Sequence, residues 1–222
     1  MEQQHSEADL KNIAKQLSCP EGEHGVKTGE MMQASNIGMT SSAINALDLQ
    51  KNETVLEIGA GNGGHIAQLL SQAENLHYFG ADISATIIAE AEKINRDLIP
   101  AGKVHFKLSD GITLPFDENR FDKIFTVNTI YFWQNPGKYL AEIKRTLKLN
   151  GTLVICFADK TFMQTLPFTP YGFKLYEVEE VKELLKNIGF TVVNILSKTE
   201  QIKSKTGEQV ERKYHVVVAS IK

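Results

Sequence analysis

The sequence has little of what defines several specialised classes of protein. Its 222 residues include two cysteines, Cys19 and Cys156, too few for a disulfide framework and without the spacing of a zinc site. The six histidines form no pair at metal-ligand spacing, so we expect no bound metal. No apolar run reaches about 18 residues, which argues against a membrane-spanning helix.

The chain also has no large excess of charge of either sign, with 24 Lys and Arg against 27 Asp and Glu. The formal net charge is −3, which is unlike the basic face of a dedicated nucleic-acid binder, and we expect no nucleic-acid partner. Basic residues near the C-terminus alternate with acids and predict a solvated sheet edge: Lys198, Lys203, Lys205, Arg212 and Lys213 against Glu200, Glu208 and Glu211. The first 20 residues lack the apolar core of a secretory signal, so we expect a cytoplasmic protein.

The composition that remains is that of an ordinary globular chain. It is 42% hydrophobic and 23% charged, which excludes a disordered chain and a coiled coil. A length of 222 residues fits one large domain with an appendage.

From about residue 53 onward, short β-rich runs alternate with helical stretches, which predicts an α/β fold with a parallel sheet. We expect strands at 54–58, 76–80, 104–108, 121–127 and 153–157, and helices at 65–72, from 84 and at 139–149. Asn150-Gly151 has the character of a helix C-terminus and should close the last of these helices. A loop of some 18 residues should follow the fifth strand.

The C-terminal part predicts a helix at 177–187 ended by Gly189, and then two long strands at about 190–199 and 211–221. A turn at 205–207 joins the two strands, which should therefore pair as an antiparallel hairpin at the sheet edge. The whole predicts a Rossmann-like, doubly wound sheet of seven strands over residues 50–222.

Residues 1–49 differ from the rest and predict a short helical appendage. Segments 6–17 and 36–48 have helical patterns, with Ser35 as a cap for the second, and a glycine-punctuated connection spans 18–33. The appendage is either a lid over a site or simply packs against the sheet, and the sequence leaves both readings open.

The strongest local signal is the glycine-rich segment Gly59–Gly64, which lies between a strand and a helix. Glycines in this position allow a sharp turn and let a ligand approach the backbone. Gly59, Gly61 and Gly64 fit the dinucleotide-binding pattern GxGxxG, whereas Gly59, Gly61 and Gly63 fit the pattern GxGxG, so the glycines alone are ambiguous. Asp82 ends the second strand, where its carboxylate can accept both hydroxyls of a ribose in either class.

Four ordered segments distinguish between these classes. They are VLEIGAGNGG, FGADIS, LSDGITLPFDENRFDKI and LAEIKRTLKLNGTLVI. With them the chain resembles, over about residues 50–222, the class I S-adenosylmethionine-dependent methyltransferases, especially the small-molecule group that includes the quinone-biosynthesis methyltransferases. It departs from the family pattern at Leu149-Asn150-Gly151, where Pro-Gly-Gly is more usual.

The resemblance implies S-adenosylmethionine as cofactor and a role for each matching residue. Glu57 would hold the glycine loop and face the cofactor's amino group, Asp82 would bind the ribose, and Ile83 would cover the adenine. Asp110 and Gly111 would contact the adenine amino group, and Asn128 would reach the methionine end. The remaining predicted contacts come from the loop itself: Gly59, Ala60, Gly61, Asn62 and Gly63.

The acceptor is expected to be a small molecule that receives the methyl group by in-line displacement, for which alignment matters more than a dedicated base. Tyr131 and Trp133, after the fourth strand, are candidate walls of its pocket, and Tyr171 is a further candidate. His24 is a candidate general base. Two alternatives stay open: a nicotinamide-dependent oxidoreductase, and a cofactor-binding protein without catalysis.

Overall fold

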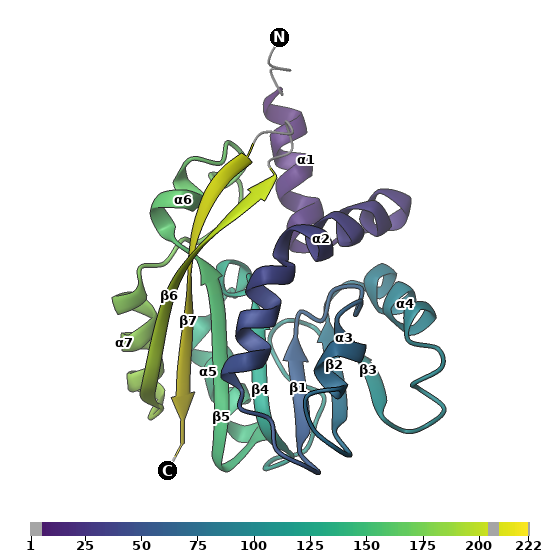
Figure 1. Cartoon of the computed structure of the whole chain (residues 1–222). Helices are drawn as coiled ribbons and strands as arrows, with labels where there is room; N and C mark the ends of the chain where they lie inside the picture. The colour runs from purple at the N-terminus through teal and green to yellow at the C-terminus, as the bar shows by residue number, and fades with distance from the viewer. Residues whose placement is uncertain (1–5, 204–208, 222) are drawn as a thin grey trace.

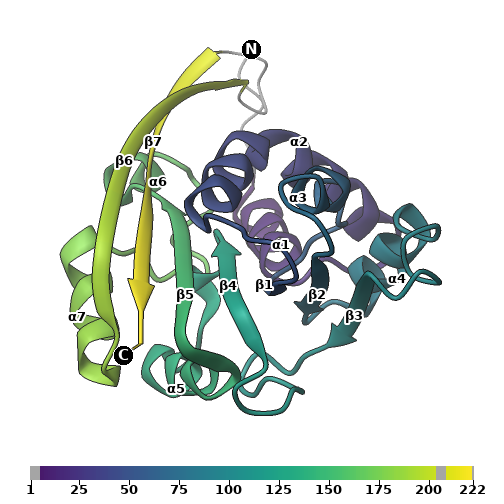
Figure 2. The same cartoon turned by 60° about the horizontal axis from the view of Figure 1, so that its bottom comes forward.

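A mixed β-sheet between two layers of helices organises the chain in the computed structural model, which describes residues 6–203 and 209–221 (Figures 1 and 2). Within those residues the sheet has seven strands in the order β3-β2-β1-β4-β5-β7-β6. Their bounds are β1 (Thr54–Ile58), β2 (His77–Asp82), β3 (Val104–Leu108), β4 (Phe121–Val127), β5 (Leu147–Ala158), β6 (Thr191–Lys203) and β7 (Gln209–Ser220). Strands β1 to β5 are parallel, and β7 lies antiparallel between β5 and β6. The predicted fold, with its terminal hairpin at the edge, is confirmed.

The described residues form seven α-helices, several of which begin or end at residues with recognisable capping chemistry. They are α1 (Glu7–Ser18), α2 (Gly22–Ala46), α3 (Ile66–Leu70), α4 (Ala85–Ile94), α5 (Pro136–Thr146), α6 (Lys160–Gln164) and α7 (Val178–Ile188), with a 3₁₀ turn, η1, at Ile130–Phe132. Ser84 caps α4 by accepting from the backbone of Ile87, and Pro136 starts α5. Gly189, at a φ of 86°, ends α7 as predicted.

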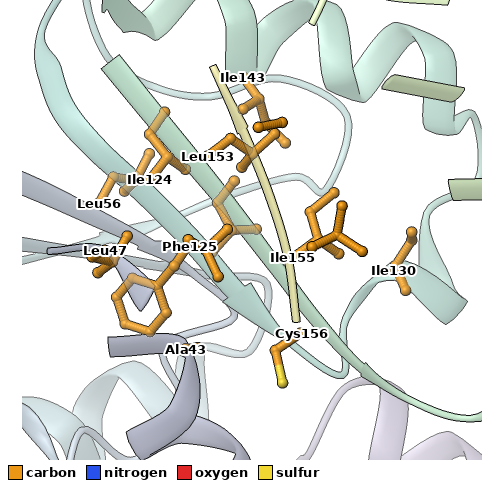
Figure 3. Close-up of a cluster of buried hydrophobic side chains, with 14 of the residues drawn as sticks. Ala43, Leu47, Leu56, Ile124, Phe125, Ile130, Ile143, Leu153, Ile155 and Cys156 are labelled. Carbon is orange, nitrogen blue, oxygen red and sulfur yellow. The ribbon is translucent and has the colours of Figure 1, made fainter. Parts of the chain in front are cut away.

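The hydrophobic core occupies both faces of the central strands (Figure 3). Leu56, Ile124 and Phe125 come from β1 and β4, and all three are fully buried. The C-terminal half of α2 contacts β4 and β5 on one face, and α5 and α7 pack against each other on the other. Truncating a side chain in this cluster should cost about 2–5 kcal/mol of stability.

Helix α2 is the largest departure from the sequence-based expectation. Residues 22–33 were expected to form a connection and Ser35 a cap, but one helix runs from Gly22 to Ala46 and contains Ser35. Each glycine disfavours a helix by about 1 kcal/mol relative to alanine, and α2 contains four glycines. Helix propensity therefore does not predict that this segment is helical. Three of these glycines allow close contacts: Gly25 with Pro20, Gly29 with Ile87 and Gly38 with Glu200.

The path of α2 explains its two roles. The helix changes direction near its middle, so that its first half passes beside α4 and its second half runs along the sheet (Figure 1). Met39 and Ala43 in the second half, and Leu47 directly after it, are fully buried in the main core. The appendage therefore both packs on the sheet and extends over its upper edge.

Three smaller expectations were wrong. Helix α5 ends at Thr146 and β5 already begins at Leu147, so Asn150 lies within a strand, at a φ of 62°, and closes no helix. The loop expected after β5 contains the short helix α6, whose cap is Asp159. Arg212 is not solvated but 5% exposed. The turn predicted at 205–207 lies outside the described residues.

Candidate functional site

A cavity of about 160 Å³ opens at the carboxyl ends of β1, β2 and β4. The chain runs from β1 through β2 to β3 on one side of β1 and then crosses over to β4 on the other side. This reversal of strand order is the usual binding position in an open parallel sheet. Residues of α2 form its cover: Gly29, Met32, Gln33, Asn36 and Thr40. Their spacing of three to four residues places them on one face of the helix.

The loop after β1 forms the floor of the cavity. Gly59 has a φ of 75° and donates its backbone N–H to the carbonyl of Ala81 at 2.8 Å. Gly61 has a φ of 55°, and the position that a side chain would occupy is open space, so a ligand can approach this backbone. Ala60 and Asn62 also line the cavity.

Gly63 does not line the cavity, although the resemblance placed it there. A Cβ at this position would overlap the side chains of Asn95 and Ile66 at 2.8 Å. Its φ of 67° also favours glycine. The third glycine of the loop therefore lets the loop pack closely on α4.

Asp82, at the end of β2, presents the acidic group of the site. Its Oδ2 accepts from the backbone N–H of Gly61 at 3.2 Å, and its Oδ1 accepts from that of Ser84 at 2.9 Å. Burial raises the pKa of Asp82 to about 6, although both hydrogen bonds favour the ionised form. Ile83 and Gly111 lie beside it on the cavity wall.

Glu57 also lines the cavity, but it carries partners that the sequence analysis missed. Its Oε2 accepts from His65 Nε2 at 2.7 Å and from the hydroxyl of Tyr78, both deeply buried. Burial lowers the pKa of His65, but the neighbouring carboxylate outweighs it and the net shift is upward. A buried acid with a histidine eight residues later was the available signal.

Asn128, at the end of β4, is held from three sides. Its backbone adopts a φ of 58°, and its Oδ1 accepts from the hydroxyl of Tyr131 at 3.0 Å and from the N–H of Ala158 at 3.2 Å. Its Nδ2 donates to Oδ1 of Asn36 on α2 at 3.2 Å. The Asn128 side chain thus has a defined orientation at the cavity wall.

The aromatic candidates separate in the structure. Trp133 lines the cavity and donates its indole N–H to the hydroxyl of Thr129 at 3.2 Å. Phe132, which the sequence analysis did not select, lines it too. Tyr131 does not, because its ring is buried and its hydroxyl is used to hold Asn128.

Three other candidates lie apart from this cavity. The carboxylate of exposed Asp110 accepts from the backbone of Ile112 and Thr113, which lowers its pKa and occupies it within its own loop. His24 lines a separate cavity between α1 and α2. Tyr171 lies under the ammonium group of Lys11. Missed lining residues include Ser109 and Tyr139 next to Gly111, and Thr129.

This sheet order, with an antiparallel β7 and a glycine loop facing an acid at the end of β2, defines the class I methyltransferase fold. The chain belongs to the family described as "Methyltransferase domain", whose profile matches residues 49–213. The chain thus carries a methyltransferase domain of the S-adenosylmethionine-dependent class. The nicotinamide-dependent alternative is therefore set aside.

Individual relatives are distant. The chain is 26% identical, over 78% of its length, to phosphoethanolamine N-methyltransferase 1 of Arabidopsis thaliana, but spans 36% of that protein. It is 28% identical to the uncharacterized methyltransferase YdaC of Bacillus subtilis, with 72% of this chain and 90% of that protein covered. A methyltransferase structure from Aquifex aeolicus shares the fold, with a TM-score of 0.65, 20% identity and coverage of 95% and 98%.

Two features are absent from the described residues. No helix in this part of the chain has the length and apolar character to cross a membrane. No group of three or more His, Cys, Asp or Glu side chains in the same residues is placed to hold a metal ion.

Proposed function

We propose that the protein methylates a small molecule held between α2 and the end of β4. The observation that carries this proposal is the cover: Gln33, Asn36 and Thr40 of α2 line the cavity together with Asn128 and Phe132, and Asn36 is hydrogen-bonded to Asn128. A cavity closed by a helix on that side suits a compact acceptor better than a polymer chain.

The site fits S-adenosylmethionine in its chemistry. The open backbone at Gly61 suits the methionine part, and the Asp82 carboxylate suits the two ribose hydroxyls. Glu57 lies at the loop, where a carboxylate attracts the cofactor's amino group, and Ile83 and Gly111 suit the adenine. Bound there, the cofactor supplies an electrophilic methyl group on a sulfonium.

The side chains near the far end of the cavity orient the acceptor without carrying charge. Asn36, Asn128 and Thr129 offer hydrogen bonds, and Phe132 and Trp133 offer aromatic surface. Such a wall aligns a nucleophile for in-line displacement and excludes water. An aromatic face adds about 0.5–2 kcal/mol of attraction for a nearby cation.

The charged side chains that line the cavity limit which molecules can be the acceptor. Among the described residues that line it there is no Lys or Arg, whereas Glu57 and Asp82 are acids. A phosphate dianion here would meet two carboxylates and no Lys or Arg side chain, so the protein would compensate little of its desolvation. We therefore infer an acceptor without a phosphate group, unlike the substrate in the name of the Arabidopsis relative.

Calorimetry with S-adenosylhomocysteine tests the cofactor site, and Asp82→Ala should abolish micromolar binding. A methyl-transfer screen then pairs each acceptor with its phosphorylated form, ethanolamine with phosphoethanolamine for example, alongside phenols and thiols. Turnover of an unphosphorylated member supports the proposal. Turnover of phosphoethanolamine contradicts the inference from charge, and tight cofactor binding without any turnover favours a binding protein without catalysis.

A further inference from the structure

A buried ion pair connects the C-terminal hairpin with the helix that covers the cavity. Arg212 on β7 and Glu200 on β6 face each other across the hairpin, with side chains 6% and 20% exposed. Glu200 Oε1 accepts from Nε of Arg212 at 3.0 Å and from its Nη2 at 2.6 Å. A pair so removed from water is held in one geometry, unlike a surface ion pair.

The same guanidinium also binds α2. Its Nη2 donates to the backbone carbonyl of Ser35 at 2.7 Å, and its Nη1 donates to Oδ1 of Asn36 at 3.0 Å. Both residues lie in the middle of α2, where the helix changes direction (Figure 1). A planar fork that satisfies a carboxylate, a carbonyl and an amide at once fixes these groups relative to one another.

Glu200 contacts the helix from a second side. Its Oε2 lies against Gly38, at the place where any larger residue would put its Cβ. Glycine at this position therefore has a packing reason, since it admits the carboxylate that Arg212 holds. The guanidinium and the carboxylate together contact Ser35, Asn36 and Gly38, which span about one turn of α2.

The contact reaches the cavity through one amide. Oδ1 of Asn36 accepts both from Arg212 and from Nδ2 of Asn128, and both asparagines line the cavity. We infer that Arg212 and Glu200 are positioning residues for the methyltransferase site: they hold the bend of α2 and fix Asn36 and Asn128 at the cavity wall. The inference rests on the proposed placement of cofactor and acceptor in this cavity.

The test uses Arg212→Lys in the full-length protein. Lysine keeps the charge opposite Glu200, so the chain should fold, but one ammonium group cannot reach Glu200, Ser35 and Asn36 together. The matched control is Lys213→Met, which removes a cation from the next position of β7. That side chain is 56% exposed, points away from Arg212 and pairs with Asp159 at 3.7 Å.

Calorimetry measures the dissociation constant of S-adenosylhomocysteine at a temperature where circular dichroism shows every variant folded. Arg212→Lys should weaken binding about tenfold, and Lys213→Met should leave it within about twofold. Asn36→Ala should also weaken binding, and the double variant should be no weaker than Asn36→Ala, because both act through one amide. A purely structural role would lower the melting temperature and leave the dissociation constant unchanged.

Hydrogen exchange over residues 29–40 gives an independent readout. We expect faster exchange there in Arg212→Lys and not in Lys213→Met. Unchanged binding and exchange in Arg212→Lys, or independent effects of Arg212→Lys and Asn36→Ala, would overturn the inference. If the wild type itself fails to bind, the proposed cofactor site is wrong, and the exchange result alone decides whether Arg212 holds the bend.

Discussion

The raised pKa of Asp82 predicts that its ionised form, which the ribose of the cofactor needs, lowers the stability of the fold. Its pKa rises from 3.8 to about 6 because the carboxyl group is buried, so the folded protein binds this proton more tightly than the unfolded chain does. An acid with a raised folded pKa stabilises the fold at low pH, and that stability is lost as the pH rises from about 4 through 6. At about 1.4 kcal/mol per unit, ionised Asp82 costs the fold about 3 kcal/mol at pH 8.

The free energy of unfolding, measured at two pH values, separates the cost of ionising Asp82 from other contributions to stability. At pH 5 the carboxyl group is mostly protonated in the folded state, so the wild type should be about 1.4 kcal/mol more stable there than at pH 8 from this group alone. Asp82→Asn removes the titration and with it this difference. It also exchanges one acceptor oxygen for a donor, costing about 1 kcal/mol at Gly61 or Ser84, equally at both pH values.

Urea unfolding of both proteins at pH 5 and pH 8 measures the effect as a difference of differences, in which the histidines cancel. Asp110→Asn is the matched control, because the lowered pKa of exposed Asp110 places its titration below this range. Parallel pH dependences for wild type and Asp82→Asn would refute the reasoning. Cofactor affinity of the wild type should fall below pH 6, since the ribose hydroxyls need the ionised acceptor.

Three further predictions follow from packing and from the buried acid. Gly63→Ala should lower the free energy of unfolding in urea by at least about 2 kcal/mol, because the new Cβ meets Asn95. Gly102 has a similar φ but lies in open space, so Gly102→Ala should show only the backbone strain of about 1 kcal/mol. Leu47→Ala should lower the free energy of unfolding by about 2–5 kcal/mol, and a loss under 1 kcal/mol would mean that α2 does not belong to the core. Glu57→Gln should lower the pKa of His65 in an NMR titration, because burial then acts without the carboxylate; an unchanged pKa would contradict the assigned cause.

The sheet was predictable because its strands are buried on both faces. Parallel central strands read as short apolar runs, and the segments Val55–Ile58 and Leu153–Phe157 have no other plausible state. Capping chemistry at Ser84 and Gly189 was equally local and held. The glycine loop and Asp82 were also recognisable from local sequence, because the loop residues are consecutive and Asp82 directly ends a strand.

The cover of the cavity was not predictable, because its signals are tertiary. A helix with four glycines scores poorly on propensity, and nothing local shows that Gly29 and Gly38 face Ile87 and Glu200. Arg212 was misread for a related reason. Alternating charges on a hairpin predict a solvated edge, and only the position of α2 shows that this one guanidinium points inward.

The two halves of α2 are anchored to different extents. The second half is fixed, since Met39, Ala43 and the following residue Leu47 belong to the main core. In the first half the buried residues are glycines, Gly25 and Gly29, and its contacts include α1, α4 and, through Gln33, His65. If a ligand enters past α2, we expect the half with less buried surface to move, because its displacement costs less. Arg212 binds Ser35 and Asn36 near the middle of α2, so its hydrogen bonds should set how far the fixed half extends.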